Sequence, residues 1–283
     1  MSSSSSESVA AQRERTLPGM LERRPGAGQR RFRHTVDLLI SLTASDLRSR
    51  YGRGPFVVVR WLVEPFALTG VYLVLTAVVL KRPGQASGLS LACAVVPFQV
   101  IMLAVTNAMT AVNIRQPIIT NMAFRRSLIP ISSVLTESCA FAASFGLIVL
   151  MMAIYGVAPT VSLLWLPLVV AVTLVFATAL AYPASLFGLW FWELRPFGVS
   201  VVRIMFFIGP GLVPLSQTGE GTRDYLRLNP LTGLFESFRA IFFYGKNPAA
   251  WELLYPLAVA LLLLALFVPL YRRDQREFAK VVQ

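Results

Sequence analysis

The chain alternates long apolar runs with short polar segments, and the length of the runs predicts helices that cross a membrane. Asp, Glu, Lys and Arg are absent from residues 83–114, 138–192 and 253–271. A helix needs about 20 mostly apolar residues to span a bilayer. Six such helices fit the pattern, at residues 57–80, 89–113, 131–155, 161–189, 197–215 and 250–271. The sequence therefore predicts an all-α integral membrane protein with a six-helix transmembrane domain over residues 56–271.

Residues 31–55 show a different pattern, in which an apolar stripe follows one side of a predicted helix. Val36, Leu47 and Tyr51 fall on one helical face, whereas the charged residues mostly occupy the other. A helix of this kind lies in the membrane interface and does not cross it. Residues 1–30, which are rich in Ser, Arg, Gly and Pro, are predicted to form a disordered tail before this interfacial helix.

Composition and charge agree with a membrane protein and orient it. Only 14% of the residues are charged, whereas soluble domains carry about 25%. Of 26 Lys and Arg residues, 20 lie in the first 60 residues, in or beside the predicted loops after the second and fourth spans, or in the basic tail 272–283. Since Lys and Arg concentrate on the cytoplasmic side, both termini are predicted to be cytoplasmic. The net charge of +12 follows this topology, and no nucleic-acid partner is expected.

The segment between the last two predicted spans, residues 216–249, is too apolar for a plain surface loop. Asn229-Pro230 gives an N-cap followed by a proline at the first helical position, where its missing N–H costs nothing. Apolar residues then recur at helical spacing, at Leu231, Leu234, Phe235, Phe238, Ile241 and Phe242. We predict one or two short helices here that re-enter the outer half of the membrane.

Motifs for several kinds of chemistry are absent from the sequence. No G-x-x-x-x-G-K-[ST] loop occurs, so this chain is not expected to bind a nucleoside triphosphate itself. The single His34 has no metal-ligating neighbours, and the two cysteines fall in apolar segments. No catalytic residue, metal site or cofactor is therefore predicted in this chain.

Charged residues near the ends of the predicted spans allow two interpretations. Arg60 and Arg203 at the cytoplasmic mouth would suit a diphosphate, because guanidinium groups bind phosphate oxygens bidentately. Glu64 would then act as a gate or phosphate sensor. Alternatively Glu64 pairs with Arg60, and Glu137 and Arg203 hold helices together or reach the interface, where charges are tolerated.

Two further features are open to a structural and a functional interpretation. The predicted inner loop, residues 114–130, is short and basic, so it is either a topology signal or a segment that docks onto a soluble partner. The aromatic residues form interfacial belts or line a channel in which rings stack on sugar faces. They are Trp190, Trp192, Phe206, Phe207, Phe235, Phe238 and Phe242.

Four stretches of the chain together resemble a known family. They are DLRSRYGRGPFVVVRWLVEPF (46–66), NIRQPIITNMAFRRSLIPISSVL (113–135), NPLTGLFESFRAIFFYG (229–245) and YRRDQREFAKVV (271–282). In order and spacing they are similar to the membrane-spanning subunit of ABC-2-type polysaccharide exporters, and the resemblance covers roughly residues 33–283. The family exports O-antigen, capsule, teichoic acid and cell-wall galactan.

The resemblance implies a multi-pass subunit of the bacterial inner membrane that works with other subunits. Two copies would form the pore among the membrane lipids, and two copies of a separate ATPase, which binds ATP and Mg, would dock beneath. The segment 216–249 would form the outer gate. The substrate would be a glycan, such as O-antigen, teichoic acid or cell-wall galactan, carried on a polyprenyl diphosphate.

The resemblance also assigns roles to residues on the cytoplasmic side. Those that couple to the ATPase subunit would be Arg115, Gln116, Ile118, Asn121, Arg125 and Arg126. Those that admit the lipid-linked substrate and bind its diphosphate would be Arg48, Arg50, Tyr51, Arg53, Arg60 and Arg203. The aromatic residues named above would line the channel and its gate.

Three other functions stay open at this level. A drug or small-lipid exporter on the same fold would have a more apolar channel. A membrane enzyme acting on lipid-linked sugars would need carboxylates or histidines at the membrane face, and the chain has only 14 acidic residues. The third is a non-catalytic membrane scaffold or an ion channel; a channel would show a selectivity filter or a ring of charges, and the sequence offers neither.

Overall fold

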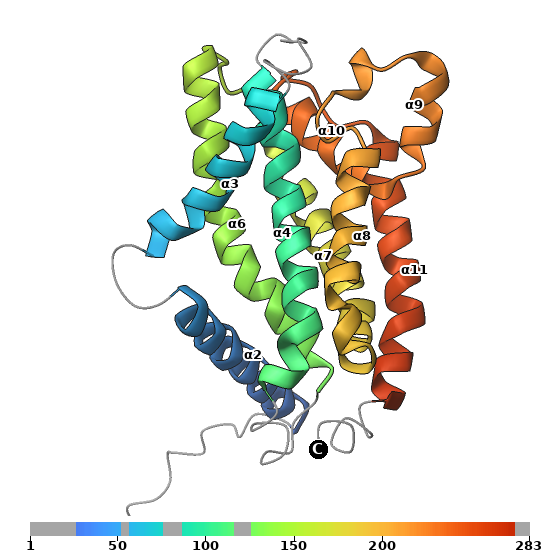
Figure 1. Ribbon diagram of the computed structural model, residues 1–283. Coiled ribbons are helices and arrows are strands. Elements are labelled where there is room, and N and C mark those ends of the chain that lie inside the picture. The colour runs from blue at the N-terminus through green and yellow to red at the C-terminus, as the bar shows by residue number, and fades with distance from the viewer. Residues whose placement is uncertain (1–26, 52–56, 76–86, 116–125, 275–283) are drawn as a thin grey trace, which may run out of the picture. The chain divides into compact units, whose positions relative to one another are not determined.

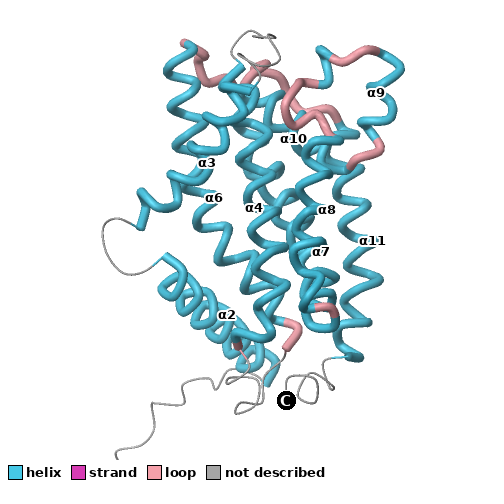
Figure 2. The backbone as a smooth tube through the Cα atoms, viewed as in Figure 1, coloured by secondary structure: helices cyan, strands magenta, loops and turns pink. Residues whose placement is uncertain are grey.

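The computed structural model describes residues 27–51, 57–75, 87–115 and 126–274, and its regular elements within these ranges are all helices (Figures 1 and 2). The chain divides into two compact units, Met1–Ser41 and Leu42–Gln283. Helix α2 (Ala27–Tyr51) begins in the first unit and ends in the second. A helix is therefore confirmed over most of the predicted interfacial segment 31–55, and it also includes residues 27–30 of the predicted tail. Its location at a membrane interface stays a prediction.

Four helices of the second unit are long and apolar enough to cross a membrane, by length and composition. They are α4 (Ser87–Ile114), α6 (Leu128–Tyr155), α7 (Leu166–Trp190, preceded by the 3-10 turn Val161–Trp165) and α11 (Ala250–Asp274). They coincide with the second, third, fourth and sixth predicted spans. Helix α11 also runs three residues into the segment predicted as the basic tail.

The other two predicted spans are shorter in the described residues. Helix α3 (Val57–Val74) has 18 residues, and residues 76–80 of the predicted span lie outside the described residues. Helix α8 (Arg195–Ile208) has 14 residues, or about 21 Å at about 1.5 Å per residue, less than the ~30 Å of a bilayer core. The predicted end at residue 215 is wrong, because Gly209 adopts an extended conformation before Pro210.

Helix α4 is the central helix of the second unit. Its side chains are largely buried, and it packs against α3, α6, α7, α8 and α10. Gly188 lets the backbones of α7 and α4 come close together, since a Cβ at this position would lie 2.1 Å from the backbone oxygen of Met109 in α4. In contrast, α11 exposes Leu261, Leu262 and Leu266, as a lipid-facing helix requires.

The segment before α11 folds as two short helices, α9 (Glu220–Arg227) and α10 (Pro230–Phe242), as the sequence predicts. The side-chain oxygen of Asn229 accepts a hydrogen bond from the backbone N–H of Leu231, which confirms the predicted N-cap. Helix α10 has no exposed face, because every residue from 231 to 242 is buried. Its polar side chains therefore need partners inside the protein.

Candidate functional site

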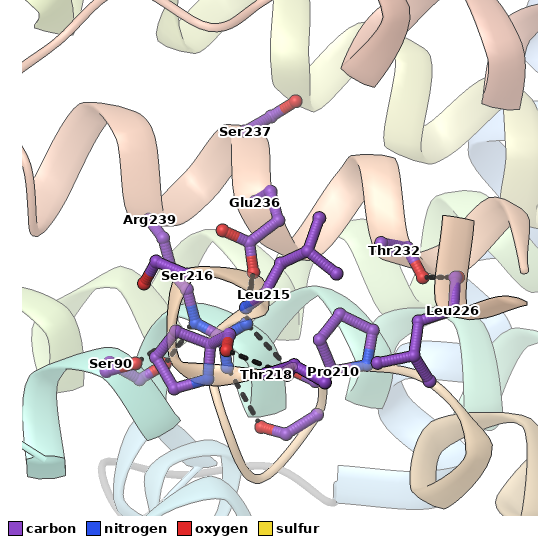
Figure 3. Close-up of polar contacts among 12 residues, drawn as sticks. Ser90, Pro210, Leu215, Ser216, Thr218, Leu226, Thr232, Glu236, Ser237 and Arg239 are labelled. Atoms are coloured by element: carbon purple, nitrogen blue, oxygen red, sulfur yellow. Dashed lines mark hydrogen bonds and ion pairs between the residues drawn. The ribbon is translucent and has the colours of Figure 1, made fainter. Parts of the chain in front are cut away.

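Polar side chains that are buried in the bundle gather at the two ends of α4, and Arg239 of α10 organises one of these clusters (Figure 3). Its Nε donates to the backbone oxygen and the hydroxyl of Ser90 at the start of α4, over 3.2 and 3.0 Å. One terminal nitrogen donates to the backbone oxygen of Pro210 over 2.6 Å, and the other to that of Gly211 over 3.0 Å. A single fully buried guanidinium thus joins α10, α4 and the segment after α8.

Glu236 completes this cluster from the preceding turn of α10. Its Oε1 accepts from Arg239 over 2.8 Å and from the backbone N–H of Leu215 over 3.0 Å. A buried ion pair is tolerated only when its remaining hydrogen-bonding groups are also satisfied. Here the backbone of residues 210, 211 and 215 supplies those partners, so the cluster fixes the irregular segment between α8 and the 3-10 turn Leu215–Gln217.

The second cluster surrounds Arg115, which follows the last turn of α4. Its side chain is 4% exposed and forms an ion pair with Asp46 in the last two turns of α2. It also donates to the backbone oxygen of Ile129, at the start of α6, over 3.3 Å. Arg115 therefore joins α2, α4 and α6. This inward orientation differs from a side chain that faces a docked partner, and its predicted coupling role stays a prediction.

Between the two clusters, Glu137 of α6 accepts a hydrogen bond from the side-chain amide of Asn107 in α4. Glu137 is buried, and its contact joins α4 and α6. The interhelical interpretation of this residue is therefore confirmed. Carboxylates inside a membrane protein are expensive unless they are paired in this manner.

The structure describes only some of the residues predicted to couple to an ATPase or to admit substrate. Arg48 and Arg203 are exposed, and Arg126 is half-buried. Residues 116–125, which include Gln116, Ile118, Asn121 and Arg125, lie outside the described residues, as does Arg53. The side chains of Arg50, Tyr51, Arg60 and Glu64 also lie outside them, so a joint site of Arg60 and Arg203 stays a prediction.

Helix α8 presents an exposed face that mixes apolar and charged side chains. Phe197, Ile204 and Phe207 are exposed on it beside Arg203, whereas Phe206 on the opposite face is buried. Ionisable residues within membrane segments usually face other helices or a water-filled cavity, because a charge in lipid is costly. This face is therefore better suited to a polar passage or a protein neighbour than to lipid alone.

The seven predicted channel aromatics divide into two groups. Trp190, Trp192 and Phe207 are exposed. The others are buried in the core and contact one another or neighbouring rings, with centroids 5.6 Å apart for Phe206–Phe235 and 6.4 Å for Phe238–Phe242. In this arrangement the core rings contact protein on all sides, and their channel role stays a prediction.

Sequence reasoning assigned no role to Arg239, Glu236 or Asp46, although Asp46 and Arg239 lie in stretches that carry the family resemblance. Arg239 and Glu236 carried a usable signal, since charged residues three positions apart in an otherwise apolar helix imply a buried pair. No local pattern pointed to the partner of Asp46, because Arg115 lies 69 residues further along the chain.

No protein-family model matches the chain. It is 30% identical over 248 residues to the O-antigen export system permease protein RfbA of Myxococcus xanthus. The matched region covers 87% of this chain and 95% of that relative. It is also similar to two O-antigen export system permease proteins RfbA of Klebsiella pneumoniae. One is 26% identical over 75% of this chain and 82% of the relative, and the other 25% identical over 88% and 96%.

Proposed function

The chain belongs to the ABC-2-type permeases of O-antigen export, and from this premise we propose that it moves a polysaccharide linked to polyprenyl diphosphate outward across the bacterial inner membrane. The observation that carries the proposal is similarity to three O-antigen export system permease proteins, over 82–96% of the length of each relative. The four long apolar helices support it, since a permease must cross the membrane several times.

The proposed topology has six spans and two cytoplasmic termini. The first span would include α3, and α8 would reach the outer side together with the irregular segment 209–215. Non-helical backbone at membrane depth is tolerated only where protein or water satisfies it. The contacts of Arg239 with the oxygens of Pro210 and Gly211 supply that satisfaction. Arg115 would lie at the cytoplasmic end of α4 and Arg239 near its outer end.

ATP hydrolysis would take place in a separate ATPase subunit, which would bind ATP and Mg. The sequence supports this division because it holds no nucleotide-binding loop. Two ATPase subunits would dock on the inner loops of two copies of this chain. Arg115, with its bonds to α2 and α6, would transmit movement of the loop to both helices.

The passage for the substrate would lie along the exposed face of α8. Arg203 would attract the diphosphate, since a guanidinium binds phosphate oxygens with charge-assisted hydrogen bonds. Phe207, one turn further along α8, and Trp192, three residues before α8, are exposed and offer ring faces to sugars. A second copy facing the first would separate this face from lipid and enclose a polar passage.

Purification of the tagged protein in mild detergent tests the proposal. We expect an ATPase subunit to co-elute in equal amount and its ATP turnover to rise when lipid-linked glycan extract is added. Stimulation by small apolar drugs, with none by the glycan, would instead support a drug exporter on the same fold. A protein that elutes without any ATPase would contradict the proposal.

A further inference from the structure

Helix α8 is a short helix that depends on polar contacts at both of its ends. At its start, Arg195 donates from two nitrogens to the backbone oxygen of Gly188, over 3.2 and 2.9 Å. At its end, the side-chain amide of Asn229 donates to the backbone oxygen of Met205 over 2.7 Å. Between these ends one face of α8 is exposed, so the rest of the bundle covers it on one side only.

The segment that follows α8 has buried backbone groups without helical partners. Residues 209–211, 214 and 215 are buried, yet the chain there forms only bends and a short 3-10 turn (Leu215–Gln217). An unsatisfied carbonyl in such a place costs as much as a lost hydrogen bond. Arg239 satisfies the carbonyls of Pro210 and Gly211, and Glu236 satisfies the N–H of Leu215.

Arg239 and Glu236 stand on a rigid base. Every residue of α10 from Leu231 onward is buried, and the helix packs against α4, α7 and α11. Arg239 also holds Ser90 at the start of α4. If the outer end of α8 moves, it must either break these hydrogen bonds or carry α10 and the start of α4 with it.

We propose that Arg239, aided by Glu236, is a positioning residue that fixes the outer end of α8 against α10 and α4 and thereby keeps the exposed face of α8 in place for the passage of substrate. The role in transport rests on the proposed function. The mechanical role does not, because it follows from the hydrogen bonds of the 210–215 backbone alone. A planar guanidinium suits this task because it offers five donors in fixed directions, whereas a lysine offers a single ammonium group.

The test measures thiol accessibility and transport with the full chain and its ATPase. Cys93 and Cys139 are replaced by Ala and Ser, and Leu215, which is 6% exposed, is replaced by Cys. A separate reporter, Ala177→Cys, lies in the fully buried core of α7. Labelling with a membrane-impermeant maleimide is then compared among the parent and the variants Arg239→Lys, Arg239→Gln and Glu236→Gln. Arg227→Lys is the matched control, because Arg227 is an exposed arginine of the neighbouring helix α9.

We expect the Arg239 variants to label at position 215 about tenfold faster than the parent and to lose about nine-tenths of the glycan export. Labelling at position 177 should stay slow, which distinguishes release of the 210–215 segment from general unfolding. Glu236→Gln should show smaller changes in the same direction, about threefold, since its amide oxygen can still accept a hydrogen bond. Arg227→Lys should match the parent in both readouts.

Unchanged labelling at position 215, or export within twofold of the parent, overturns the proposal for Arg239. If neither Arg239 variant accumulates in the membrane, the Glu236→Gln variant is tested by the same two readouts. Labelling and export equal to those of the parent would then overturn the proposal. If the parent itself shows no ATP-dependent export, the proposed function fails. The labelling comparison still tests whether Arg239 holds the segment.

Discussion

The ion pair between Arg115 and Asp46 leads to a quantitative prediction about the place where α2, α4 and α6 meet. Replacing Arg115 by Met removes the guanidinium and retains most of the apolar stem. The two side chains are only 4% and 14% exposed, so the Asp46 carboxylate would be left without a partner in a site largely closed to water. Removing one partner of a buried ion pair costs about 3–5 kcal/mol. We expect the free energy of unfolding to fall by about 3 kcal/mol, because Asp46 keeps some contact with solvent.

A double-mutant cycle with Asp46→Asn isolates the pair from other effects of the substitution. The double variant removes both charges, so it should be less destabilised than the sum of the two single variants. We expect a coupling energy of about 2 kcal/mol, well above the ~0.5 kcal/mol within which independent sites add. The assay is reversible unfolding of the full chain in mixed micelles, followed by circular dichroism.

Arg48→Met serves as the matched control, because Arg48 is an exposed arginine two residues from Asp46 on the same helix. Exposed substitutions away from special features usually change stability by less than about 0.5 kcal/mol. A coupling energy near zero, or a loss in Arg48→Met as large as that in Arg115→Met, would refute the reasoning from burial and pairing.

Three further predictions concern the interior of the bundle and are measured as changes in the free energy of unfolding by the same assay. Glu137→Leu should cost about 1–3 kcal/mol because it leaves the half-buried Asn107 amide without this acceptor, whereas Glu137→Gln should cost less; equal losses would contradict this. Gly188→Ala should be strongly destabilising, since its Cβ would lie 2.1 Å from the Met109 backbone oxygen, whereas Gly70→Ala, with open space around it, should be neutral or stabilising by about 0.5–1 kcal/mol. Phe238→Ala should destabilise the fold by about 3–5 kcal/mol, because its ring is fully buried; normal stability with lost export would instead support a direct channel role.

Features that depend on nearby residues could be predicted from the sequence. The start of α10 at Pro230 was predictable because the cap and the proline act within one turn, and the long spans followed from uninterrupted apolar runs. The end of α8 was also encoded locally, in Gly209-Pro210-Gly211, although the apolar run continues past it. The length of an apolar run predicts how long a membrane segment is. Whether the backbone of that segment is helical throughout depends on its glycines and prolines.

Features that depend on distant residues could not be predicted in this way. Arg239 meets Ser90 across 149 positions, and nothing in either stretch specifies the other. The burial of Phe235 and Phe238 likewise arises from helices that surround α10 completely, whereas their spacing alone suggested one apolar face. The family resemblance supplied the function, because the export of a glycan depends on an assembly that no single segment of this chain encodes.

ATP-dependent transport in inverted membrane vesicles tests the central claim most directly. Vesicles that contain the chain and its ATPase would be loaded from outside with fluorescently labelled glycan on polyprenyl diphosphate, and the label protected from an added glycosidase would be measured. We predict protection that rises with time in the presence of ATP and Mg, and that is abolished by a hydrolysis-deficient ATPase subunit. Label that stays fully accessible to the glycosidase, in vesicles whose ATPase is active, would contradict the claim that this permease exports a lipid-linked polysaccharide.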